Sequence, residues 1–267
     1  MESTTHDEGP ISHDDIERKF WHLPAWLQGS QIPSFEVIDT RSAQGRLDPV
    51  PKLVSLTDLV LFHGHACDGL LRGVWAMRAL ADVVFPDQPF DRSDLLVVSK
   101  NSPCLGDLAA YLTGARARFG THRLDDTLGV GFLVQSLSTG EAWEVREERG
   151  FFPELIAKWE AMLLRDELTS DEKAELLAVH EAAQWDWVRR ALLPSSPSEH
   201  YHVKHLDQLS PPPPIHEARR TDTVNRTVAP PRVVTTRYEP DLDSDVPVDP
   251  LPEAWVRRYN DGPQLLS

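Results

Sequence analysis

Glycine and proline are unevenly distributed along this chain of 267 residues, and this limits how much of it can pack into a core. Ten of the 14 glycines lie between Gly64 and Gly150, whereas 13 of the 22 prolines lie between Pro194 and Pro263. Glycine marks tight turns between regular elements, and dense proline without a repeat interrupts helices and sheets. We therefore predict a turn-rich folded region followed by an extended tail.

The two ends of the chain set the expected domain limits. Residues 1–15 are polar and acidic and are predicted to be disordered. The folded domain is expected over residues 16–210, beginning with a short helix or clamp at residues 16–27. Residues 211–267 form the Pro-rich, acidic tail.

Charge and hydropathy exclude several kinds of partner. The net charge of −15 argues against binding to nucleic-acid phosphates or to an anionic membrane surface. No apolar stretch approaches the ~18 residues of a membrane span, and the acidic N-terminus does not resemble a secretory signal. Two cysteines are too few for a disulfide framework and suit a reducing compartment. We predict a cytoplasmic protein without a nucleic-acid or membrane partner.

Hydrophobic periodicity predicts the regular elements. Apolar residues recur at helical spacing from Asp68 to Phe85, and Leu95 to Ser99 is typical of a buried strand. Gly69 and Gly73 lie four apart on this helix and would let another backbone approach closely, which favours a dimer contact. The other predicted elements are a helix from Pro103 ending before Gly114, a hairpin over 130–145, helices at 153–165 and 170–192 with Ser170 as N-cap, and a strand at 200–206.

The densest group of reactive side chains lies between His63 and Asp68, with His65 and Cys67 inside it. Gly64 lets the chain bend, so that several of these side chains can converge. Cys67 and Asp68 stand at the first turn of a helix, where free N–H groups and the helix dipole favour a thiolate. Both metal binding and nucleophilic attack require a thiolate. The alternative is a plain turn with a buried cysteine, but the density of these residues favours a metal site.

A second candidate is the pair Cys104 and Asp107. Cys104 stands at a helix start that follows a strand, and Asp107 lies three residues on, so both occupy one helix face. Cys104 could equally pack as a small apolar residue, as buried cysteines often do.

A third candidate is a basic loop in this acidic chain. Its arginines could hold an anionic substrate group through bidentate hydrogen bonds, or they could be solvated and paired with the aspartates that follow. Its histidine could act as an acid–base group or a metal ligand. The residues concerned are Arg116, Arg118, His122 and Arg123.

A fourth candidate is the pair His200 and His202, which would face the same side of a strand, a geometry common in metal sites. Because this segment opens the polar tail, we interpret it as a surface strand.

Four motifs occur in order along the chain and together resemble one known family. They are Phe62-His63-Gly64-His65-x-Cys67-x-Gly69, Ser102-x-Cys104-x-x-Asp107, Leu112-Thr113-Gly114 and Phe119-Gly120. This set resembles the FmdE family, whose name comes from a component of formylmethanofuran dehydrogenase, over about residues 55–210.

The resemblance implies an α+β domain in which helices pack on a mixed β-sheet, followed here by a two-helix segment and the Pro-rich extended tail. It also implies a homodimer and a metal, most often zinc. Carried over by position, the metal ligands are His63, His65, Cys67 and Cys104.

The chain departs from the family pattern at several positions. Asp68, Ala115 and Thr121 replace a proline, a cysteine and a lysine of the typical motifs. Many family members end in a zinc ribbon with paired cysteines, but no cysteine follows Cys104 here, so this ribbon's metal cannot be present. These changes indicate divergence from the parent role, and nothing in the motifs requires methanofuran or a molybdenum or tungsten partner.

Three functions are compatible with these residues. The first is a zinc-like, metal-dependent enzyme with hydrolytic or lyase chemistry on a small anionic molecule, whose catalytic candidates are Cys67, Asp68, Asp107 and His122. The second is a non-catalytic metal-binding accessory or sensor protein. The third is a metal-free thiol enzyme with Cys67 as nucleophile.

Overall fold

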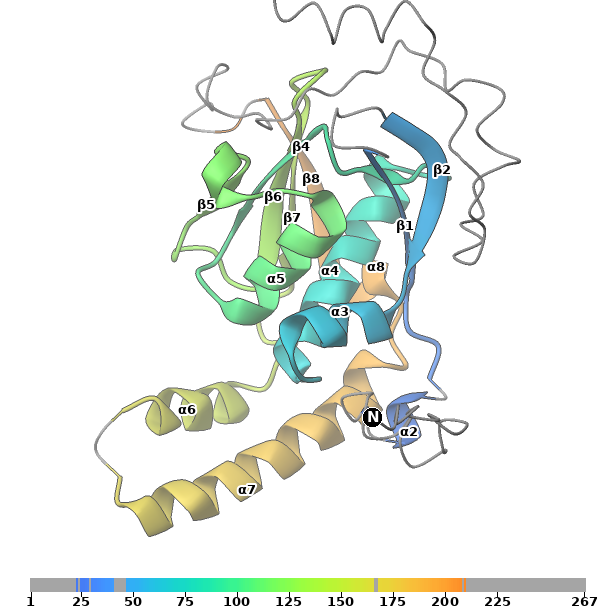
Figure 1. Cartoon of the computed structure of the whole chain (residues 1–267). Coiled ribbons are helices and arrows are strands. Elements are labelled where there is room, and N and C mark those ends of the chain that lie inside the picture. The colour runs from blue at the N-terminus through green and yellow to red at the C-terminus, as the bar shows by residue number, and fades with distance from the viewer. Residues whose placement is uncertain are drawn as a thin grey trace, which may run out of the picture. The chain divides into compact units, whose positions relative to one another are not determined.

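A mixed five-stranded sheet organises the fold in the computed structural model, which describes residues 23, 25–28, 30–40, 47–165, 168–207 and 209 (Figure 1). The strand order is β5-β4-β6-β7-β8, and only the β4–β5 pair is parallel. The strands are β4 (Leu95–Ser99), β5 (His122–Leu124), β6 (Gly131–Ser136), β7 (Ala142–Glu147) and β8 (Tyr201–Leu206).

Alternating side chains give this sheet two apolar faces. Val97, Phe132 and Val145 are fully buried on the face that the helices cover. Leu96 and Ala142 point to the opposite face, where they join a smaller buried cluster. Burial on both faces explains why the sequence of β4 is a continuous apolar run instead of an alternating one.

Three helices pack around the centre of the domain. Helix α4 (Asp68–Val84) lies against β6, β7 and β8, while α5 (Pro103–Thr113) lies against β4 and α4. Helix α3 (Leu56–His63) packs on α5. The expected ends of α4 and α5 are confirmed, with Gly114 as a left-handed C-cap at φ 71°.

The glycine face of α4 is used inside the chain. A Cβ at Gly69 would lie 3.0 Å from the Sγ of Cys104, and one at Gly73 would lie 2.7 Å from the Cδ2 of Leu108. Both neighbours belong to α5, so the two glycines allow α4 and α5 to approach closely. The expectation that these glycines favour a dimer contact was therefore wrong.

A smaller sheet of order β2-β1-β3 adjoins this core. It consists of β1 (Phe35–Thr40), β2 (Leu47–Val54) and β3 (Phe90–Asp91). Before it comes the short helix α2 (Ala25–Gln28), in which Leu27 is buried. Most of the helix or clamp expected at residues 16–27 lies outside the described residues, as do the N-terminal segment 1–15 and the tail 211–267.

The two-helix segment follows the hairpin of β6 and β7, as expected. Helices α6 (Glu154–Leu163) and α7 (Ser170–Trp187) pack on each other. The N-cap of α7 is Thr169, whose side chain forms a capping box with Glu172, so the expected N-cap Ser170 is instead the first helical residue. The remaining helical turns are η1 (Ala117–Phe119), the π-helical η2 (Val188–Leu192) and α8 (Pro197–His200).

These elements form an α+β fold with mixed sheets packed by helices, as expected. In the part of the chain that the structure describes, no helix combines the length and the apolar character needed to span a membrane.

Candidate metal centre

The connection between α3 and α4 carries two histidines and the first cysteine. Helix α3 ends at His63, and Gly64, at φ 100°, caps it and donates its N–H to the carbonyl of Val60 at 2.7 Å. Glycine adopts this left-handed conformation at little cost, so the chain can turn sharply here. Cys67 is the N-cap of α4, where its Sγ accepts the N–H of Leu70 at 3.3 Å.

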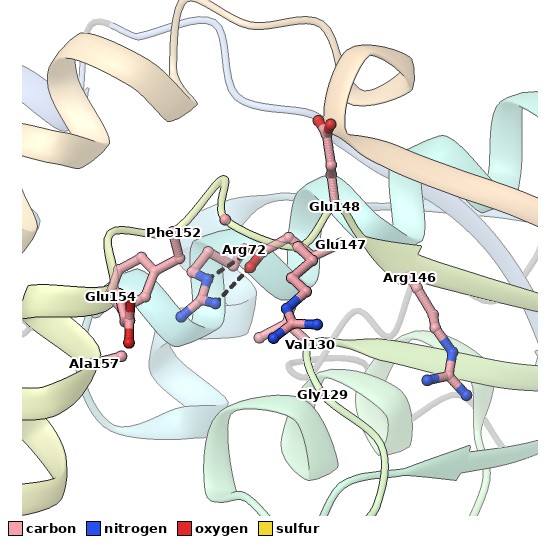
Figure 2. A pocket seen from close by; sticks show the side chains of 11 residues that line it. Arg72, Gly129, Val130, Arg146, Glu147, Glu148, Phe152, Glu154 and Ala157 are labelled. Atoms are coloured by element: carbon pink, nitrogen blue, oxygen red, sulfur yellow. Dashed lines mark hydrogen bonds and ion pairs between the residues drawn. The ribbon is translucent and has the colours of Figure 1, made fainter.

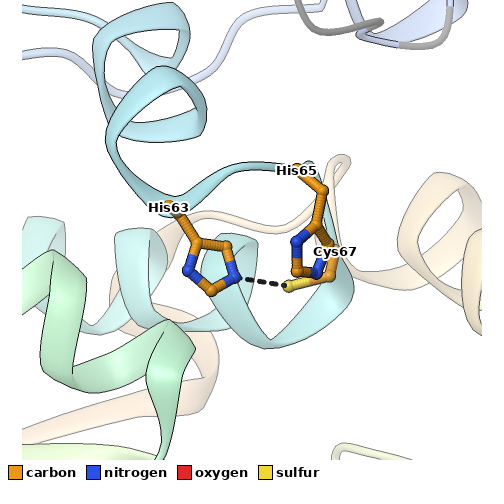
Figure 3. Close-up of side chains that lie close together, drawn as sticks. All are labelled: His63, His65 and Cys67. Carbon is orange, nitrogen blue, oxygen red and sulfur yellow. Dashed lines mark hydrogen bonds between the residues drawn. The ribbon is translucent and has the colours of Figure 1, made fainter.

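The potential ligand atoms of His63, His65 and Cys67 converge at this turn (Figure 3). They lie within 4.8 Å of one another, and the Nε2 of His63 is 3.8 Å from the Sγ of Cys67. The side chain of His63 is only 2% exposed, whereas His65 is exposed. The cluster therefore has a buried side at His63 and a solvent-facing side at His65.

Cys104 reaches the same cluster from the start of α5. Its Sγ lies 3.4 Å from the Sγ of Cys67. The sulfur also sits over Gly69, where any side chain would crowd it. The close packing of α4 on α5 thus brings the second cysteine to the first, whereas the donor atoms that all lie within 4.8 Å of one another are those of His63, His65 and Cys67.

Asp107 orients His63. Its Oδ2 accepts a hydrogen bond from the Nδ1 of His63 at 2.8 Å. With Nδ1 carrying the proton, the Nε2 lone pair is directed at Cys67. A carboxylate behind a histidine is the usual arrangement at metal sites, since it fixes the ring and raises its basicity. Asp107 and Cys104 both lie on α5, and the structure places the Asp107 carboxylate against the His63 ring.

A hydrogen bond between the two sulfurs shifts the pKa values of the two thiols in opposite directions. The bond from the Cys67 thiol, assisted by the nearby His63, lowers the pKa of Cys104 to about 6. The same bond, together with burial, raises the pKa of Cys67. Burial and the neighbouring His63 lower the pKa of His65. Proton loss is thus easier at Cys104 than at Cys67, and the lowered pKa of His65 favours the neutral imidazole, the form in which histidine binds metals.

The donor atoms of His63, His65, Cys67 and Cys104 are of the types that could hold a divalent transition metal such as zinc. Zinc bonds to sulfur and imidazole nitrogen in a tetrahedron place neighbouring ligand atoms roughly 3.5 to 3.8 Å apart. The distances of 3.4 Å between the sulfurs and 3.8 Å between His63 and Cys67 are close to these values. Two thiols and two imidazoles are a donor set that zinc commonly uses.

Asp68 belongs to a half-buried charge network beside the cluster. Its carboxylate lies 3.5 Å from Arg72, and Arg72 forms a bidentate pair with Glu147 at 2.6 and 2.8 Å. Glu147 also accepts the hydroxyl of Tyr201 at 3.0 Å. Sequence reasoning missed this network because Arg72 and Glu147 lie on different elements and show no local pattern.

Arg72 and Glu147 of this network line a cavity of about 540 Å³ between β7 and α6 (Figure 2). The guanidinium of Arg72 lies 3.8 Å from the ring of Phe152. Charges of both signs line the cavity, and none of the four cluster residues does.

The remaining predicted site residues lie around α5 and β5. His122 contacts the buried Ser99 at 2.9 Å, and burial lowers its pKa, as does the nearby Arg116. Arg116 donates to the carbonyls of Ala110 and Ala115 at the end of α5. The structure does not bring these groups into the His/Cys cluster, and their catalytic and substrate-binding roles stay predictions. The same holds for Arg118, which lies over the ring of Phe119, and for Arg123 in β5.

The two histidines near β8 are not a pair on one strand. His200 ends α8, stacks on Phe151 at 3.8 Å and contacts Glu148 at 2.9 Å. His202 lies on β8 and is exposed, as the surface-strand interpretation predicted.

The segment of the chain that carries this site matches the model of a known protein family. The model of the FmdE family, described as "Molybdenum formylmethanofuran dehydrogenase operon", matches residues 62–198, a little over half of the chain. The chain therefore belongs to the FmdE family. The matched region contains all four residues of the His/Cys cluster.

Among solved structures, the chain is similar to an FmdE-like protein of the tungsten formylmethanofuran dehydrogenase type from Syntrophus aciditrophicus. The identity is 18%, the match covers 57% of this chain and 70% of that one, and the TM-score is 0.34. No curated protein matches the sequence.

Proposed function

We propose that this protein binds a zinc-like divalent transition metal through His63, Cys67 and Cys104, with His65 at the fourth position. The observation that carries this proposal is the placement of Asp107 behind His63, which fixes the ring with Nε2 toward Cys67. The 3.8 Å from this imidazole to the Cys67 sulfur and the 3.4 Å between the two sulfurs suit ligands of one tetrahedral ion.

We further propose that the centre is catalytic, with hydrolytic or lyase chemistry on a small anionic molecule. A bound ion of this kind polarises a carbonyl or lowers the pKa of a bound water. His65 is the exposed member of the cluster, so replacing it by water would leave three protein ligands, the number typical of catalytic zinc. In this scheme Asp107 holds the His63 proton at Nδ1, while Asp68 and His122 are the acid–base candidates.

The second candidate is a non-catalytic accessory or sensor role. The observation that favours it is the number of donors, because His63, His65 and Cys67 converge and Cys104, in contact with Cys67, is a candidate for the fourth ligand. Four protein ligands are typical of closed, structural sites.

Cobalt substitution distinguishes the two candidates. The visible spectrum of Co²⁺ bound to the chain depends on the ligand set, and an open site takes up added phosphate or a small carboxylate. We expect such an anion to change the wild-type spectrum and to change that of His65→Ala more strongly. A spectrum that no anion changes would favour the closed site, and failure to bind Co²⁺ would contradict the metal centre itself.

We also propose that the protein is a homodimer and resides in the cytoplasm. The dimer is what the resemblance to the FmdE family implies, and the compartment is supported by the two free thiols, which a reducing environment preserves.

A further inference from the structure

We propose that Cys67 and Cys104 form a peroxide-reactive dithiol site, which closes to an intramolecular disulfide and thereby releases the bound metal. The consequence for the metal rests on the proposed function, whereas the disulfide itself does not. The two sulfurs come from different helices and lie 3.4 Å apart.

The geometry is close to that of a disulfide. A disulfide holds its sulfurs about 2.0 Å apart, so the pair has to close by little more than 1 Å, which side-chain rotation can supply. Gly69 leaves the space in which Cys104 approaches Cys67. These are the only two cysteines of the chain, so neither has another intramolecular partner.

The pair is also accessible. Both cysteines are partly exposed, and the exposed His65 stands on the solvent side of the cluster. Each cysteine lies at the start of a helix and not within the buried sheet. A small hydroperoxide therefore has only a short path from solvent to these half-buried side chains.

The chemistry balances with hydrogen peroxide as the oxidant. The sulfur of one cysteine attacks a peroxide oxygen, the O–O bond breaks, and the product is a sulfenic acid and one water. The second sulfur then attacks the sulfenic sulfur, the S–O bond breaks, and its oxygen leaves as water with the thiol proton. The two thiols together lose two electrons, and the peroxide is reduced to two waters.

Metal binding and disulfide formation exclude each other. A disulfide sulfur carries no thiolate charge, so oxidation removes two of the four donors and leaves His63 and His65 alone. Conversely, a bound ion occupies the lone pairs with which the thiolates would attack. By mass action, free metal at ten times its Kd slows cross-linking roughly tenfold.

Peptide mapping of the peroxide-treated chain tests the proposal. Trypsin cleaves after Lys52, Arg72, Lys100 and Arg116, so the disulfide links peptide 53–72 to peptide 101–116. We expect hydrogen peroxide to produce this linked peptide in the metal-free chain. In the zinc-loaded chain, a chelating dye should detect zinc release in step with the link, and a thiol reductant should restore binding.

Variants provide the controls. Cys67→Ser and Cys104→Ser cannot form the link. Gly69→Ala places a Cβ 3.0 Å from the Cys104 sulfur and should slow linking, whereas Gly106→Ala, with 3.7 Å to its nearest neighbour, should not.

Three other results would test the dithiol site, the exclusion of metal by the disulfide and the proposed function separately. Oxidation of both cysteines to sulfinic acids without the linked peptide would overturn the dithiol site. A linked peptide with zinc still bound would overturn the mutual exclusion. A chain that forms the link but never binds zinc would keep the dithiol site and overturn the proposed function instead.

Discussion

The two ring nitrogens of His63 have different partners, and this single residue shows how the centre is assembled. Asp107 accepts the proton of Nδ1, and Nε2 is left facing Cys67. The motif predicted that His63 belongs to a metal site, but it could not show the second partner. Asp107 lies 44 residues away on another helix, and only the packing of α3 on α5 brings the two together.

Removing this carboxylate should weaken metal binding while leaving the ligands in place. We expect Asp107→Asn to lower the affinity for zinc about 10- to 100-fold, because the amide holds the ring less firmly and does not raise its basicity. Competition against a chelating dye measures the change. Asp126→Asn, at an exposed carboxylate, is the matched control. Equal affinities for the two variants would show that Asp107 does not support the ligand.

The unequal acidities of the two thiols predict a pH-dependent reaction of the metal-free chain. The pKa of Cys104 is lowered to about 6, so its thiolate is present above that pH and is lost as the pH falls through it. Cys67 has a raised pKa and stays a thiol over the same range. We expect iodoacetamide to label peptide 101–116 first, with a midpoint near pH 6. Equal labelling of both cysteines with a midpoint near the ordinary value of about 8.5 would contradict this account.

At the scale of elements, the sequence predicted the helices and strands better than it predicted their contacts. The helix at Asp68, the buried strand at Leu95 and the hairpin all follow from local spacing and turn residues, and all are present. What packs on each element depends on residues far along the chain. The bidentate pair of Arg72 and Glu147 joins positions 75 residues apart, and no local pattern marks it.

The close approach of α4 and α5 gives a stability prediction. An alanine at Gly73 would gain up to about 1 kcal/mol of helix propensity but lose about 1–3 kcal/mol by crowding Leu105 and Leu108. We expect the crowding to dominate and the melting temperature to fall by about 2–4 °C per kcal/mol of net loss.

The control for this prediction is Gly106→Ala on α5, where the nearest neighbour is 3.7 Å away. This variant should be as stable as the wild type or more stable. A Gly73→Ala variant that melts at or above the wild-type temperature would show that α4 and α5 do not need this glycine.

At the scale of the whole molecule, α5 occupies the glycine face of α4, so Gly69 and Gly73 do not support the proposed dimer. It now rests on the family alone. Light scattering at micromolar concentration should give a mass near twice the 30.1 kDa of one chain. A mass of one chain at that concentration would contradict the dimer without bearing on the proposed metal centre, whose candidate ligands all come from one chain.

If His63, Cys67 and Cys104 hold one metal ion, elemental analysis of purified variants will show which residues the ion needs. A serine hydroxyl does not replace a thiolate as a soft ligand, so Cys67→Ser and Cys104→Ser should lose most of the bound metal, as should His63→Ala. His200→Ala and His202→Ala should keep it. Full metal content in the two cysteine variants, or loss only in the two β8-region variants, would contradict the account.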